Sequence, residues 1–213
     1  MRLVLPRLYV ILDSALLKIS AIDCARELAD AGVRLMQYRD KSSPPREILT
    51  TSQKLADFLI PRSIALYVND RADIAALAGA TGVHVGQEDL DVEQARQLVG
   101  VEKRVGVSTH NDAQFEAAVD TSADYIAIGP IFPTGSKLNP DPVVGLDTIR
   151  RVRSLTDRPI VAIGGITLET AALVRRAGAD SVAVISDIVR APSPGKRARE
   201  YLNTLGSEDQ AAV

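Results

Sequence analysis

Hydrogen-bond donors stand at alternate positions of one short segment: an amide at Gln37, a guanidinium at Arg39 and an ammonium at Lys41. Side chains two residues apart in an extended chain point to the same side, so these three are expected to form one donor-rich row. The row carries two positive charges and therefore suits an anionic ligand. The predicted binding segment also includes the two residues between them, Tyr38 and Asp40.

Two carboxylates, Asp70 and Asp89, each follow a segment that is expected to be a strand. Mg²⁺ prefers oxygen ligands and commonly takes one or two carboxylates together with waters and substrate phosphates. The two side chains are therefore candidate ligands of a Mg²⁺ ion shared with a diphosphate. The alternative is that each carboxylate only caps the helix that follows it, which is a common role of Asp after a strand.

Small hydrogen-bonding residues, Asn69 and Ser108, end two of the predicted strands. Their amide and hydroxyl groups can read the edge of a heterocycle, which makes them candidate substrate ligands. The two histidines of the chain, His84 and His110, have neither a second His nor a Cys at metal-ligand spacing. We therefore expect His84 to be a packed or hydrogen-bonded residue rather than a metal ligand.

Two short turns, at 164–167 and 185–187, follow the last two predicted strands. Each is expected to expose backbone N–H groups at the start of a helix, where the helix dipole also favours an anion. Gly165, Ile185 and Ser186 are therefore candidate phosphate ligands. The alternative is that the glycines of the first turn serve only close packing.

The segment 131–144 is rich in Gly and Pro and is too long for an ordinary connection between a strand and a helix. It is predicted to be a mobile loop that closes over bound substrate. Its hydroxyl groups and its cation suit phosphate oxygens. The candidate ligands in this loop are Thr134, Gly135, Ser136 and Lys137.

The elements that must carry these residues recur along the chain: a helical stretch ends at Ala, Gly or Asp, and a β-branched apolar run soon follows. Strands are predicted near 8–13, 35–40, 65–70, 82–87, 104–109, 124–130, 159–165 and 181–186. Strands that are apolar on both faces indicate a parallel sheet covered by helices. Because polar residues gather at the strand ends, we predict an α/β fold with a single (β/α)8 TIM barrel over 1–206 and a disordered tail at 207–213. A doubly wound open sheet is the competing architecture.

The composition limits the kinds of partner that the protein can have. The chain has 213 residues, with 25 basic and 27 acidic side chains and a formal net charge of −2. This balance provides no overall field that would recruit nucleic acid or an anionic membrane, so any anion site must be local. The single cysteine, Cys24, excludes an intrachain disulfide, and no apolar run approaches the ~20 residues of a membrane span. We predict a cytoplasmic protein with small-molecule partners, and a homo-oligomer is compatible with these features.

The order of the motifs resembles that of the thiamine phosphate synthase (thiamine-phosphate pyrophosphorylase) family over nearly the whole chain. The residues that carry the resemblance are Gln37, Arg39 and Lys41, then Val68 to Asp70, then His84, Gly86, Gln87 and Asp89, then Gly106 and Ser108, then Gly129 to Thr134 with Ser136 and Lys137, then Ile163 to Ile166, and finally Ile185 and Ser186. Two positions in the loop depart from the family pattern, because Gly135 separates the hydroxyls and Ser136 stands where threonine is common.

The resemblance implies a transferase of thiamine biosynthesis. Its reaction condenses 4-amino-2-methyl-5-hydroxymethylpyrimidine diphosphate with thiazole phosphate and releases thiamine phosphate and pyrophosphate by a dissociative, Mg²⁺-assisted mechanism. By position, the pyrimidine diphosphate is assigned to 37–41, Asn69, Ser108 and Lys137, the Mg²⁺ to Asp70 and Asp89, and the thiazole phosphate to 134–136, Gly165, Ile185 and Ser186. The residues implied in catalysis are Arg39, Lys41, Ser108 and Lys137.

Two other functions are compatible with parts of this pattern. A thiazole tautomerase of the same superfamily needs a similar phosphate site but no diphosphate and metal site. A non-catalytic sensor of a phosphate ligand is expected to have lost a residue such as Asp70 or Lys137, and both are present. The chain shows no candidate nucleophile or catalytic triad, and a dissociative reaction needs neither.

Overall fold

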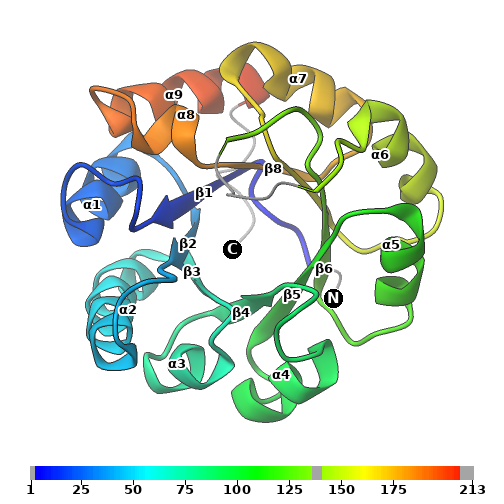
Figure 1. Cartoon of the computed structure of the whole chain (residues 1–213). Coiled ribbons are helices and arrows are strands. Elements are labelled where there is room, and N and C mark those ends of the chain that lie inside the picture. Colours follow the sequence, from blue (N-terminus) through cyan, green and yellow to red (C-terminus); the bar gives the residue numbers. More distant parts are fainter. Residues whose placement is uncertain (1–2, 136–140, 207–213) are drawn as a thin grey trace.

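The computed structural model describes residues 3–135 and 141–206. In this part of the chain, parallel strands form one closed barrel in the order β1-β2-β3-β4-β5-β6-β7-β8 (Figure 1). The strands are β1 (Leu8–Asp13), β2 (Leu35–Arg39), β3 (Ala65–Asn69), β4 (Gly82–Val85), β5 (Arg104–Thr109), β6 (Tyr125–Ile128), β7 (Ile160–Ile163) and β8 (Ser181–Val184). The barrel closes where Val10 of β1 pairs with Val184 of β8. The predicted (β/α)8 barrel is confirmed, and the open doubly wound sheet is excluded.

The helices form a ring outside the barrel (Figure 1). They are α1 (Ala21–Ala31), α2 (Pro45–Leu59), the short 3₁₀ helix η1 (Ile60–Arg62), α3 (Ala72–Leu77), α4 (Val92–Val99), α5 (Asp112–Val119), α6 (Gly145–Arg153), α7 (Leu168–Arg176), α8 (Ser186–Val189) and α9 (Pro194–Leu205). The last helix, α9, packs against α1 and α7 and so completes the ring. None of the helices in residues 3–135 and 141–206 combines the length and the apolar character needed to span a bilayer.

Strands β6, β7 and β8 end about two residues earlier than the sequence predicted. After β6 comes Gly129–Pro130, and proline has no N–H to continue a ladder. After β7 the chain leaves the extended conformation at Gly164, whose φ is 98°. The residue after β8, Ile185, already caps α8. The strand ends are therefore followed at once by backbone that turns across the mouth of the barrel.

A layer of aromatic side chains fills the barrel interior. The rings of Tyr9, Tyr67 and Tyr125 lie with their centroids 5.5 to 6.2 Å apart, in tilted and edge-on arrangements. Gly106 on β5 makes room for this layer, because a Cβ at that position would lie 2.0 Å from the Tyr125 ring. Tyr9 and Tyr125 sit near the N-terminal ends of their strands, so the C-terminal ends remain available to polar side chains. The tail predicted at 207–213 lies outside the described residues.

Candidate active site

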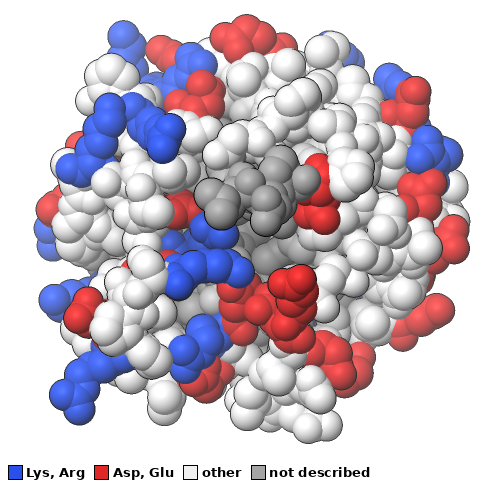
Figure 2. All heavy atoms as spheres, in the orientation of Figure 1, with Lys and Arg blue, Asp and Glu red and all other residues white. Residues whose placement is uncertain are grey.

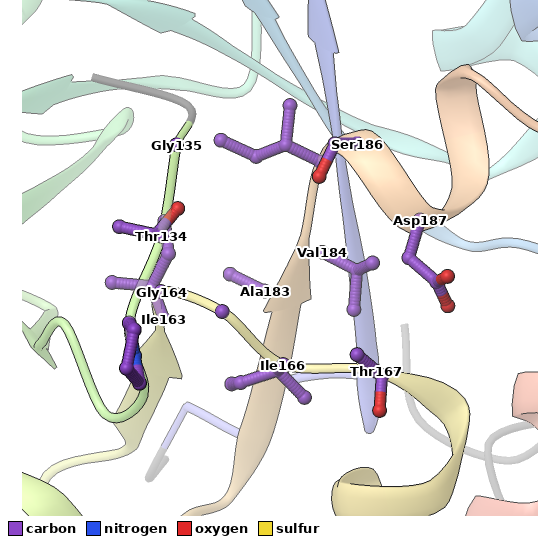
Figure 3. Close-up of a pocket in the computed structure, with 13 residues that line it drawn as sticks. Thr134, Gly135, Ile163, Gly164, Ile166, Thr167, Ala183, Val184, Ser186 and Asp187 are labelled. Atoms are coloured by element: carbon purple, nitrogen blue, oxygen red, sulfur yellow. The ribbon is translucent and has the colours of Figure 1, made fainter. Parts of the chain in front are cut away.

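Two cavities open among the C-terminal strand ends. The first has a volume of about 640 Å³ and is lined by residues that follow or end β2 to β5, with Asp141 from the segment before α6. The second has a volume of about 380 Å³ and lies between the segment at Pro133–Gly135 and the turns after β7 and β8 (Figure 3). Figure 2 shows basic and acidic side chains meeting near the centre of this face. Most of the predicted site residues that the structure describes line one of these two cavities.

The predicted donor row divides into a buried residue and two cavity residues. Gln37 is only 2% exposed and donates from Nε2 to the Tyr9 hydroxyl inside the barrel, at 2.9 Å. Arg39 and Lys41 line the first cavity. Lys41 forms an ion pair with Asp70, with 2.9 Å between Nζ and Oδ2. The two positive charges expected from the row therefore lie at the first cavity. The Gln37 amide instead lies inside the barrel, bonded to Tyr9.

Tyr38 and Asp40 are not among the described residues that line these two cavities. Tyr38 packs in the core between the strands and the helices, and its hydroxyl donates to the Asp40 carboxylate at 2.9 Å. Asp40 also accepts the backbone N–H groups of Ser42 and Ser43. Burial alone would raise the pKa of Asp40, but the hydrogen bonds from Ser43, Ser42 and Tyr38 outweigh it and hold the pKa well below its usual range. In this structure both residues stabilise the β2–α2 loop.

Neither candidate metal ligand caps a helix. The residue at the N-cap of α3 is Arg71, and its helix has no side-chain cap. Helix α4 is capped by Asp91, which forms a reciprocal capping box with Gln94. Asp89 instead accepts the Gly86 N–H at 2.8 Å. The alternative role that the sequence left open for both carboxylates is therefore not observed.

Asp70 and Asp89 lie close enough for one carboxyl group to affect the pKa of the other. Burial raises the pKa of Asp89, and Asp70 raises it further, against the opposing effects of the Gly86 N–H and Lys41. Asp70 adopts a left-handed backbone with φ of 62°, and its N–H donates to the His84 carbonyl at 2.8 Å. Such conformations cost about 1–3 kcal/mol and concentrate at functional sites. The fold thus holds two like charges together at a cost, which fits a site for a divalent cation.

The carboxylate pair would bind a metal only with help from a ligand. Among residues 3–135 and 141–206, no group of three or more His, Cys, Asp or Glu side chains is arranged to hold a metal ion. Mg²⁺ typically keeps several waters and completes its shell with substrate phosphates, so two carboxylates are a sufficient protein contribution. Asp70 and Asp89 are accordingly the residues that could hold it.

The candidate readers of a heterocycle, Asn69 and Ser108, both line the first cavity. The Ser108 hydroxyl lies 2.8 Å from His84 Nε2, and the Ser108 carbonyl accepts from Gln87 Nε2 at 2.7 Å. His84 is 8% exposed, and its other ring nitrogen, Nδ1, lies 2.8 Å from the Tyr125 hydroxyl. The prediction that His84 is a packed and hydrogen-bonded residue is confirmed.

The second cavity is lined by the backbone of the turns after β7 and β8, including Gly165, Ile185 and Ser186. Gly165 has φ of 64°, and a Cβ there would lie 2.4 Å from the Pro133 carbonyl oxygen. The Gly165 N–H donates no hydrogen bond to any of the described residues, and Ser186 opens α8 with its N–H outside the helix ladder. Backbone donors of this kind suit a phosphate. The close approach of Pro133 thus requires glycine at position 165, and the Gly165 N–H is available to an anion.

The predicted loop is tied to the barrel at both ends. Ile131 and Phe132 donate backbone hydrogen bonds to the carbonyls of Ile163 and Gly164, at 2.9 and 3.0 Å, and Val144 donates to Pro130 at 2.9 Å. These bonds place Thr134 and Gly135 along one side of the second cavity, opposite Ser186 (Figure 3). Ser136 and Lys137 lie outside the described residues.

Comparison with known proteins shows the family. A family model described as thiamine monophosphate synthase matches residues 8–188. The chain belongs to this family. A thiamine-phosphate synthase from Koribacter versatilis is 51% identical over 95% of the chain and 97% of the relative. One from Chloroflexus aurantiacus is 42% identical over 97% of the chain and 96% of the relative. The solved structure of a thiamine phosphate pyrophosphorylase from Pyrococcus furiosus superposes with a TM-score of 0.86 at 31% identity, covering 96% of both chains.

In this thiamine monophosphate synthase barrel, some residues at the site were not found by sequence reasoning. Asp13, the last residue of β1, is 3% exposed and accepts a hydrogen bond from the Arg39 guanidinium. Tyr9 and Tyr125 connect Gln37 to His84 through their hydroxyls. The available signal for Asp13 was its position as a polar residue at a strand end. The two tyrosines gave no comparable signal, because aromatic residues inside strands usually indicate core packing.

Proposed function

We propose that this protein condenses 4-amino-2-methyl-5-hydroxymethylpyrimidine diphosphate with thiazole phosphate to give thiamine phosphate and pyrophosphate. The observation that carries the proposal is the pairing of two unlike cavities at one end of the barrel. The first combines the cations Arg39 and Lys41 with several carboxylates, Asp70 and Asp89 among them, and with the polar side chains of Asn69 and Ser108. The second is lined by the turns after β7 and β8, in which Gly165, Ile185 and Ser186 are the proposed backbone donors. Two substrates with different anionic groups match this arrangement, as does the family to which the chain belongs.

In the proposed complex the first cavity binds the pyrimidine diphosphate. Arg39 and Lys41 neutralise the diphosphate, whose negative charge increases on the leaving group as its bond to carbon breaks. Asn69 and Ser108 orient the pyrimidine ring through its edge. Asp70 and Asp89 would hold Mg²⁺, which when bound supplies further positive charge to the diphosphate. Asp13 keeps the Arg39 guanidinium directed along the cavity wall.

The second cavity binds the phosphate of the thiazole substrate. Gly165, Ile185 and Ser186 present backbone N–H groups to its oxygens. Thr134 and Gly135 line the opposite side. The hydroxyls of Thr134 and Ser136 are assigned to the same phosphate as further donors. Fixing the phosphate there directs the thiazole ring toward the first cavity, so that its nitrogen can approach the pyrimidine methylene carbon.

The proposed reaction needs no general base. The carbon–oxygen bond to the diphosphate breaks first, and its electron pair leaves with pyrophosphate. The thiazole nitrogen then donates its lone pair to the methylene cation, which forms the new carbon–nitrogen bond without a proton transfer. Arg39, Lys41 and Lys137 stabilise the leaving group, while Ser108 keeps the ring in position. Positioning and electrostatics account for the catalysis.

The test is a product assay on the purified protein with Mg²⁺ and both substrates. We expect thiamine phosphate and pyrophosphate in equal amounts. Lys41→Ala should reduce turnover strongly, whereas Arg26→Ala should not, although both variants remove a cation of similar exposure from an ion pair, 54% and 56% of the side chain. Absence of product from the wild-type protein would refute the proposal. Isomerisation of a thiazole phosphate alone, without pyrophosphate release, would indicate the tautomerase.

The proposal also covers the setting of the reaction. We place it in the cytoplasm, which the buried and unpaired Cys24 supports, because free thiols persist in a reducing compartment. The partners are small molecules, and assembly into a homo-oligomer can be measured by light scattering.

A further inference from the structure

A continuous chain of hydrogen bonds crosses the barrel interior and ends at the first cavity. Gln37 Nε2 donates to the Tyr9 hydroxyl at 2.9 Å, and the Tyr9 and Tyr125 hydroxyls lie 3.1 Å apart. The Tyr125 hydroxyl lies 2.8 Å from His84 Nδ1, and His84 Nε2 lies 2.8 Å from Ser108 Oγ. The chain thus joins residues of β2, β1, β6, β4 and β5, and Ser108 is the member that orients substrate in the proposed function.

The Gln37 amide, which donates to Tyr9, favours one direction of donation along this chain. Tyr9 accepts from Gln37, so its own proton is available to the Tyr125 oxygen. In this direction Tyr125 donates its proton to His84 Nδ1, 2.8 Å away, and the role of that nitrogen depends on the tautomer. A neutral imidazole that accepts at Nδ1 carries its proton on Nε2, from which it donates to Ser108. With its oxygen already accepting, Ser108 has its own proton free for a ligand.

The surroundings keep both phenols protonated and fixed. Tyr9 and Tyr125 are 1% and 0% exposed, and burial raises the pKa of each far above its usual value. The imidazole of His84 stacks on the Tyr125 ring, with centroids 5.5 Å apart and 18° between the planes. Both hydroxyls therefore keep their protons in the working pH range, and each can donate within the chain.

We propose that Tyr9 and Tyr125 are positioning residues that hold His84 as the Nε2–H tautomer, so that Ser108 presents a hydrogen-bond donor to an acceptor atom of the bound heterocycle. This proposal rests on the proposed function for the identity of the heterocycle, a pyrimidine whose ring nitrogens are acceptors. It assigns a role to buried tyrosines that do not line the cavity. It also predicts that a ligand with a donor at the matching ring position is disfavoured at this site.

The tautomer can be read directly by ¹⁵N NMR of protein labelled in the imidazole ring. The chain has two histidines, and His110→Gln assigns the remaining signal to His84. For the free protein we expect a protonated Nε2 and an unprotonated Nδ1. Tyr125→Phe should shift this balance, because it removes the donor to Nδ1 and keeps the ring in the space left by Gly106.

Tyr67→Phe is the matched control, because Tyr67 belongs to the same aromatic layer but its hydroxyl is not part of the chain. Tyr125→Phe should raise the KM for the pyrimidine diphosphate about tenfold, equivalent to about 1.4 kcal/mol, with the KM for thiazole phosphate unchanged. Tyr67→Phe should change neither the tautomer nor either KM.

Two results would overturn the proposal: an Nδ1–H tautomer in the wild-type protein, or an unchanged tautomer in Tyr125→Phe. The first corresponds to a chain that runs in reverse, with Ser108 donating to His84. These measurements need no substrate. If the protein forms thiamine phosphate while His84 is the Nδ1–H tautomer, the positioning role of the tyrosines is refuted and the proposed function is not. The expected tautomer without any product would refute the proposed function and leave the hydrogen-bond chain supported.

Discussion

Replacing Gly165 with alanine should close the proposed phosphate site without removing any side chain. The added Cβ would lie 2.4 Å from the Pro133 carbonyl oxygen and 2.7 Å from that of Phe132. These atoms belong to the backbone and cannot rotate away. The segment that carries Thr134 and Gly135 into the second cavity must therefore move, or the turn after β7 must move away from it.

The size of the effect follows from these distances. Ordinary contacts between carbon and oxygen begin at about 3.3 Å. The Pro133 oxygen therefore has to shift by about 0.9 Å, the difference between about 3.3 Å and the 2.4 Å contact. A displacement of that size stretches a hydrogen bond of about 2.9 Å beyond bonding range. One lost hydrogen bond to a charged group costs about 1.5–3 kcal/mol, so the KM for thiazole phosphate should rise about 10- to 150-fold.

The assay is steady-state kinetics with each substrate varied in turn. Gly79→Ala is the matched control, because Gly79 has φ of 68°, close to the 64° of Gly165, but no atom lies within 4 Å of its added Cβ. Both variants should lose about 1–2 kcal/mol of stability from the left-handed backbone. The KM for thiazole phosphate should rise only in Gly165→Ala. Equal KM values in the two variants would refute the steric reasoning.

Further substitutions test the remaining parts of the site. Ser186→Ala should change the KM for thiazole phosphate less than threefold, since the backbone N–H is retained; a loss as large as that of Gly165→Ala would contradict a backbone site. Asp89→Asn should weaken the Mg²⁺ dependence of turnover without lowering the metal-free Tm, because burial and the adjoining carboxylate already disfavour its charge; full activity in excess chelator would refute a metal role. Asp13→Asn should raise the KM for the pyrimidine diphosphate by loosening Arg39, and normal kinetics would show that the contact is only structural. Lys137→Ala should lower the single-turnover rate about 10²-fold with a smaller change in diphosphate Kd, and the reverse pattern would make Lys137 a binding residue only.

The architecture could be predicted because short local sequence patterns specify each strand, helix and turn of the barrel. Each strand is a short apolar run, each helix has an apolar stripe, and the turn residues between them recur at regular intervals. Strand ends were less predictable. The apolar runs of β6 and β7 continue past Gly129 and Gly164 in the sequence. The backbone nevertheless leaves the sheet near these glycines, at Pro130 and at Gly164 itself, for reasons of covalent geometry.

Much of the candidate site could be predicted once the barrel was predicted. In a parallel barrel the C-terminal strand ends converge, so polar residues such as Asn69, Ser108 and Asp70 must lie near one another. The sequence could not show which of them face a ligand. Gln37 and Arg39 share a strand face, yet one is buried against a tyrosine and the other lines the cavity. The difference depends on depth within the barrel, which local spacing does not encode.

By itself, then, the sequence determined the closed barrel of consecutive strands, and it predicted the end of the barrel for the candidate site and most of the groups that line the two cavities there. Only the tertiary structure decided which partner each group has. Tyr9 and Tyr125 are 116 residues apart, and His84 and Tyr125 are 41 apart. Their hydrogen bonds exist because closure of the sheet brings β1, β4 and β6 to face one another across a narrow interior. A periodic pattern specifies the face on which a side chain lies, but long-range pairing in the closed barrel specifies what it meets.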